Sequence, residues 1–155
     1  MVTSSDMPLV LYVEDEDDNF VIAELRLRGR FQVIRAATDR EACDMVRRHA
    51  GELRAVLMDL QLKGAELDGG QLTRLFMGQP VGKTLPAWAQ GLPQLKVPVF
   101  VVTAYGATLH ADADVSSAAS LFSKPVDYRQ LIKALQAIPK LRTPMAAPSS
   151  SSAGL

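Results

Sequence analysis

The sequence lacks most features that would restrict it to a specialised class. It has a single cysteine, Cys43, so no disulfide can form within the chain. Aromatic residues make up 6% of it and the formal net charge is zero, which gives no indication of nucleic-acid binding. No apolar run approaches the roughly 20 residues of a membrane span, and the N-terminus does not read as a signal peptide. We therefore expect a cytoplasmic protein, with Cys43 as a small core residue.

Short apolar runs alternate with helical patterns along the chain. Because the runs are apolar on both faces, they are typical of buried parallel strands. The predicted strands are 9–13, 31–36, 55–58, 97–103 and, more weakly, 120–123. The alternation predicts an α/β fold: a doubly wound, five-stranded parallel sheet of the flavodoxin-like type, with helices on both faces.

Capping residues mark where the helices begin. The predicted helices and caps are 17–28 with Asp17 or Asp18, 39–50 with Thr38 and Glu41 in a capping box, a third helix with Asp68, and 127–138 with Asp127. In the first helix, Phe20, Val21 and Leu25 recur at helical spacing.

Two segments interrupt this alternation. Residues 77–96 hold three prolines, three glycines and the only tryptophan, Trp88, and they are longer than an ordinary α/β connection. We interpret them as an insertion before the fourth strand, with Trp88 either packing the insertion onto the body or anchoring a partner. Residues 141–155 are rich in Pro, Ala and Ser and read as a disordered tail or linker. The domain itself is expected to span 1–140.

Charged and hydroxyl side chains directly follow four of the five predicted strands. Glu14-Asp15 follow the first, Asp59 the third, Thr103 ends the fourth, and Lys124 follows the fifth. Since the carboxyl ends of parallel strands meet at one edge, these side chains should gather there. Clustered carboxylates need a cation, and an open site with oxygen ligands suits Mg²⁺. Asp59 could then accept a phosphoryl group, with Lys124 and Thr103 as donors to its oxygens.

This arrangement resembles the receiver domains of response regulators in two-component signalling. The resemblance implies that Glu14, Asp15, Asp59 and the backbone carbonyl of Gln61 bind Mg²⁺, and that Asp59 is the phosphoacceptor. It also implies roles for Thr103 and Lys124 at the phosphoryl group, and a cis peptide bond before Pro125. A histidine kinase or phosphotransfer protein would donate the phosphoryl group. The output would pass to an unknown protein partner through the surface of the fourth helix, fifth strand and last helix.

The chain departs from the family pattern after the phosphoacceptor. In "DLQLKGAELDGG", Lys63 stands where proline is usual, and Asp68-Gly69 come two residues late, so the loop should be longer and less rigid. The position of the aromatic switch residue holds Leu121, with Phe122 beside it. These departures leave open a degenerate receiver that binds a partner without phosphorylation.

Other functional interpretations are weaker. A haloacid-dehalogenase-like phosphohydrolase would need a second aspartate where this chain has Gln61. The stretch "GQPVGKT" misses the Walker A spacing by one residue, and His49 and His110 have no metal-ligand spacing. We expect no enzymatic activity beyond phosphoryl acceptance and slow loss, no membrane or nucleic-acid partner, and leave a homodimer open. Tyr105 could limit water access to Asp59, and Glu16 remains unassigned.

Overall fold

The computed structural model describes residues 7–104 and 118–139. The elements follow one another as β1 (Leu9–Val13), α1 (Asp17–Leu27), β2 (Gln32–Ala36), α2 (Asp39–His49), β3 (Leu53–Met58), α3 (Gly69–Phe76), the 3₁₀ turn η2 (Ala87–Ala89), β4 (Val99–Thr103), β5 (Ser120–Ser123) and α4 (Tyr128–Gln136). Tyr105, His110 and the proposed tail at 141–155 lie outside the described residues. No helix among the described residues is long and apolar enough to cross a membrane.

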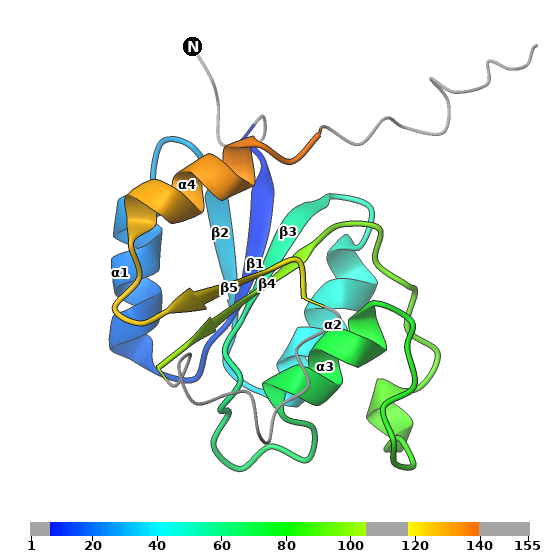
Figure 1. Cartoon of the computed structure of the whole chain (residues 1–155). Coiled ribbons are helices and arrows are strands. Elements are labelled where there is room, and N and C mark those ends of the chain that lie inside the picture. The colour runs from blue at the N-terminus through cyan, green and yellow to red at the C-terminus, as the bar shows by residue number, and fades with distance from the viewer. Residues whose placement is uncertain (1–6, 105–117, 140–155) are drawn as a thin grey trace, which may run out of the picture.

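The five strands form one parallel sheet in the order β2-β1-β3-β4-β5. In Figure 1, α1 and α4 lie on one face of this sheet and α2 and α3 on the other. The predicted doubly wound five-stranded architecture is therefore confirmed. Because the crossovers are right-handed, the step from β1 out to β2 places α1 on one face of the sheet. The steps from β2 to β3 and from β3 to β4 run in the opposite direction across the sheet and place α2 and α3 on the other face.

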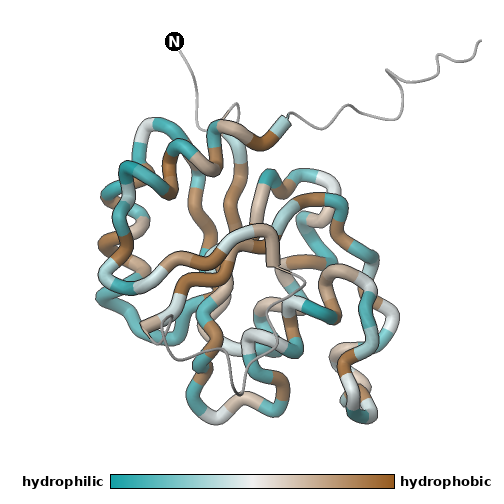
Figure 2. Tube along the Cα trace, in the orientation of Figure 1, coloured by the Kyte–Doolittle hydropathy of each residue, from teal (hydrophilic) through white to brown (hydrophobic). Residues whose placement is uncertain are grey.

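The core is divided by the sheet into two apolar layers. One layer joins side chains of α2 and α3 to the sheet, and the other joins those of α1 and α4 to its opposite face. All residues of β1 and β4 are buried, as expected of strands apolar on both sides. The apolar strands run through the middle of the molecule in Figure 2, between more polar helices. Cys43 is buried in the α2 layer, as predicted.

The first helix has an N-cap residue other than the predicted one, and only some of its apolar residues face the sheet. Its N-cap residue is Glu16, which makes no side-chain capping bond, so neither Asp17 nor Asp18 is the cap. Its buried residues are Ala23 and Leu27, whereas Val21 is 49% and Leu25 55% exposed. The small Ala23 lets the helix pack closely on the sheet. Val21, Ile22 and Leu25 are left on the outer face.

The other helices begin where their caps predict. The Thr38 hydroxyl accepts from the Glu41 amide at 3.1 Å, while the Glu41 carboxylate accepts from the Ala37 amide at 2.8 Å. Asp68 and Gln71 form a complete capping box at α3. Asp127 accepts from two amides at the start of α4, so all three predicted N-termini are confirmed.

Residues 77–98 connect α3 to β4 with no regular element except η2. Trp88 is half-buried and packs on the α2–α3 layer beside buried Ala89. The Arg40 guanidinium lies 5.3 Å from the centre of the Trp88 ring. The contacts thus match the interpretation of Trp88 as a packing residue that holds this segment to the body.

Candidate functional site

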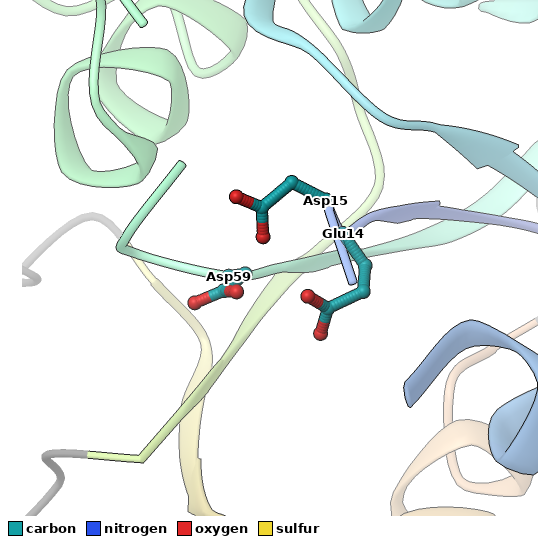
Figure 3. A group of neighbouring side chains, drawn as sticks. All are labelled: Glu14, Asp15 and Asp59. Atoms are coloured by element: carbon teal, nitrogen blue, oxygen red, sulfur yellow. The ribbon is translucent and has the colours of Figure 1, made fainter. Parts of the chain in front are cut away.

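Parallel pairing brings the acids that follow β1 close to the acid that follows β3. Val13, the last residue of β1, pairs with Met58, the last residue of β3. The residues that follow these strands therefore leave the sheet side by side, and the Asp59 amide donates to the Val13 carbonyl at 3.0 Å. Figure 3 shows the side chains of Glu14, Asp15 and Asp59 gathered at this edge. One carboxylate oxygen from each lies within 4.8 Å of the others.

Lys124, which directly follows the edge strand β5, reaches the same point. Its ammonium lies 2.8 Å from Glu14 Oε1 and 3.3 Å from Asp59 Oδ2. The Lys124 amide donates to the carbonyl of Thr103 at 2.9 Å, so the ends of β4 and β5 are joined there. Thr103 is fully buried at the carboxyl end of β4. The Lys124–Pro125 bond is cis, as predicted.

The buried carboxylates compete for charge compensation. Burial, together with the negative charge of Glu14, raises the pKa of Asp59 to about 6. Burial would also raise the pKa of Glu14, but hydrogen bonds from Lys124 and the Glu16 amide lower it below its ordinary value. Lys124 keeps a raised pKa despite its burial, because Glu14 and Asp59 both favour the ammonium form. Glu14 and Asp59 therefore share the single positive charge of Lys124.

Backbone groups of the loop after β3 hold two of these acids. The amide of Gln61 donates to Asp59 Oδ1 at 3.1 Å, and that of Lys63 donates to Asp15 Oδ2 at 2.8 Å. At the far end of the loop, a Cβ on Gly69 would lie 2.1 Å from the Asp59 carbonyl oxygen. Only glycine therefore fits where α3 begins against the Asp59 backbone.

Three contact residues were not found by sequence reasoning. The Tyr12 hydroxyl donates to Glu14 Oε1 at 3.0 Å, and burial and this acid raise the pKa of Tyr12. Arg35 donates to the Glu14 carbonyl at 3.0 Å and pairs with Asp17 at 2.7 Å. The buried Asp39 accepts from two loop amides. A signal existed for Tyr12, since residues two apart share one side of a strand. The sequence offers none for the other two.

The donor set suits a hard divalent cation. All three clustered side chains are carboxylates, and no sulfur or imidazole is part of this group. Mg²⁺ is bound in proteins by one or two carboxylates together with waters. A second positive charge would relieve the repulsion that raises the pKa of Asp59. The residues present thus fit Mg²⁺.

Comparison with known structures decides the fold family. The receiver domain of a sensor histidine kinase from Pseudomonas aeruginosa, solved with magnesium coordinated in its active-site cleft, is 25% identical with a TM-score of 0.61, over 85% of this chain and 97% of that one. The chain has the fold of response-regulator receiver domains. A response regulator from Chloroflexus aurantiacus matches with 26% identity and a TM-score of 0.64, over 85% of this chain and 97% of that one.

A third receiver domain, from Methylobacillus flagellatus, is 21% identical with a TM-score of 0.65, over 86% of this chain and 99% of that one. Neither a family model nor a curated protein matches the sequence.

In this receiver fold, Leu121 lies 39% exposed on β5, while Phe122 packs edge-on against Phe100 with ring centres 5.9 Å apart. The aromatic side chain of β5 is thus partly buried and packs against the core.

Proposed function

We propose that this chain is a phosphoacceptor receiver domain of a two-component system, phosphorylated on Asp59 in a Mg²⁺-dependent reaction. The observation that carries the proposal is the placement of Lys124 between Glu14 and Asp59, with Asp15 completing the acidic group. An ordinary surface would disperse these charges. Binding of a metal ion and a phosphoryl group would explain why three carboxylates and one lysine gather at the strand ends.

The chain's residues have separate parts in this reaction. An Asp59 carboxylate oxygen forms a bond to phosphorus, the donor's bond to phosphorus breaks, and the leaving group keeps that electron pair. Since its pKa is about 6, Asp59 is ionised and nucleophilic at neutral pH. Lys124 and Thr103 would bind the transferred oxygens. Bound Mg²⁺, held by Glu14, Asp15, Asp59 and the Gln61 carbonyl, would neutralise charge on the phosphoryl group.

A protein donor would approach along α1. This helix begins beside the acidic group, and it exposes Val21, Ile22 and Leu25 by 49%, 48% and 55%. Exposed aliphatic side chains grouped on one helix are typical of a protein contact. We propose a histidine kinase or phosphotransfer protein as the occupant of this face, in the cytoplasm, with the output passed to a further protein.

Mass spectrometry tests the phosphoacceptor directly. The protein is incubated with acetyl phosphate and Mg²⁺, and its intact mass is measured with and without EDTA. We expect a Mg²⁺-dependent gain of one phosphoryl group, lost in Asp59→Asn and kept in Asp44→Asn, a matched change at an exposed acid of α2. No adduct on the wild type at millimolar donor would refute the proposal and favour a degenerate receiver.

The same experiment separates a phosphohydrolase. Gln61 is exposed, and its backbone amide is bonded to Asp59, so no second acid stands two residues after the proposed nucleophile. We therefore expect a single acceptance of phosphate rather than continuous turnover. Steady release of inorganic phosphate from a phosphate ester, lost in Asp59→Asn, would favour the phosphohydrolase instead.

A further inference from the structure

Glu66 joins the loop after β3 to two other parts of the chain. Its amide donates to Asp39 Oδ2 at 2.8 Å, and its carbonyl accepts from Lys83 Nζ at 2.9 Å. Its carboxylate Oε1 lies 3.4 Å from Arg40 Nη2 and 3.4 Å from Trp88 Nε1. Lys83 and Trp88 both belong to the 77–96 segment. The loop that follows Asp59 is thus bonded to that segment through one residue.

The first half of the same loop contacts the acidic group. Gln61 and Lys63 donate their amides to Asp59 and Asp15, each occupying one carboxylate oxygen. Only Gly64 and Ala65 separate Lys63 from Glu66. A shift of the loop at Glu66 would therefore alter the orientation of two acids that the proposed metal needs.

The 77–96 segment is itself firmly attached to the body. Arg47 donates to the carbonyls of Trp88 and Gln90 at 2.6 and 3.0 Å. Ala89 and Leu95 are buried in the core, and the Leu95 amide donates to the Phe76 carbonyl at 2.8 Å. The segment can thus serve as a fixed support against which the loop is held.

We propose that the 77–96 segment positions the loop after β3 through Glu66. The contacts of Trp88 and the affinity of the acidic group for Mg²⁺ are then coupled. The inference rests on the proposed function, since it concerns the same metal site. Coupling between two sites is reciprocal: what holds the loop changes metal binding, and metal binding changes the contacts of Trp88. Glu66 is a positioning residue in this scheme. The contacts of Trp88 in the 77–96 segment then differ between the metal-free and the Mg²⁺-bound protein.

Three variants separate positioning from simple charge. Glu66→Ala removes the contacts with Arg40 and Trp88, whereas Glu66→Gln removes the charge but keeps an acceptor oxygen. Glu24→Ala removes an exposed acid of α1 and serves as the control for net charge. Because the Glu66 side chain is 57% exposed, all three proteins should fold, which circular dichroism checks.

Calorimetric titration with MgCl₂ is the deciding measurement. We expect Glu66→Ala to weaken Mg²⁺ binding about three- to tenfold, within the usual range of coupling between sites, while Glu66→Gln and Glu24→Ala stay within about twofold of wild type. An unchanged affinity in Glu66→Ala, or equal losses in the Ala and Gln variants, would overturn the inference and leave the proposed function standing. Absence of Mg²⁺ binding to the wild type would instead refute the metal site of the proposed function.

Two readouts follow the coupling itself. Trp88 is the only tryptophan, so its emission should change on addition of Mg²⁺ in the wild type and not in Glu66→Ala. In Mg²⁺-free buffer, hydrogen exchange of the Lys63 and Leu67 amides should be faster in Glu66→Ala than in Glu24→Ala. Calorimetric binding of Mg²⁺ without any change in Trp88 emission would also overturn the coupling.

Discussion

Replacing Asp59 by asparagine should stabilise the metal-free protein at neutral pH. The side chain is almost completely buried, and its pKa is raised from 3.8 to about 6 by burial and by Glu14. Each pKa unit corresponds to about 1.4 kcal/mol, so the ionised carboxylate costs the folded state up to about 3 kcal/mol. Glu14 titrates together with Asp59 and has a lowered pKa, which returns part of this cost. We therefore expect Asp59→Asn to gain about 2 kcal/mol.

The gain should depend on pH in a defined direction. Between about pH 4 and 6, folded Asp59 keeps a proton that the unfolded chain has lost, so the wild type loses stability as the pH rises through this window. Asparagine cannot titrate. The difference between the two proteins should be small near pH 4 and complete above pH 7.

Urea unfolding in EDTA at pH 4.5 and pH 8 measures both quantities, with Glu24→Gln as the control at an exposed acid. Mg²⁺ should narrow the difference, because it stabilises the wild type by about 1.4 kcal/mol when present at ten times its dissociation constant. If Asp59→Asn is less stable than wild type at pH 8, or gains the same free energy of unfolding at both pH values, the ionised Asp59 carboxylate does not destabilise the folded protein.

Three further outcomes follow from the same contacts. Lys124→Met should lower the free energy of unfolding by about 3 kcal/mol in EDTA at pH 8, because it leaves two buried carboxylates without their cation; a loss unaffected by Mg²⁺ would contradict this reason. Gly69→Ala should lower the free energy of unfolding in urea by about 2 kcal/mol or more, since its Cβ would overlap the Asp59 backbone. The control Gly51→Ala, where a Cβ meets open space, should leave this free energy nearly unchanged. Leu25→Ser should slow phosphoryl transfer from a protein donor severalfold but leave labelling by acetyl phosphate unchanged; equal effects on both donors would exclude a docking role.

The sequence contained enough to predict the sheet and the membership of the acidic group. Apolar runs identify the strands, and a residue just past a strand must lie at the sheet edge whatever the rest of the fold does. This reasoning placed Glu14, Asp15, Asp59 and Lys124 together correctly, because their positions depend only on strand ends and parallel pairing. Caps such as Asp68 were also predictable, since their partners are three residues away.

Tertiary structure decided what depends on contacts between distant segments. The helical spacing in α1 did not indicate which residues meet the sheet, because the small buried residue Ala23 carries little hydrophobic signal beside the exposed Val21 and Leu25. Asp39 and Glu66 are 27 positions apart, and Glu66 and Trp88 are 22 apart. No local pattern indicates such pairs, because they arise only when separate elements pack against each other. The grouping of the acids at the strand ends could thus be predicted from the sequence, whereas the contacts of the loop with these acids and with the 77–96 segment arise only from tertiary packing.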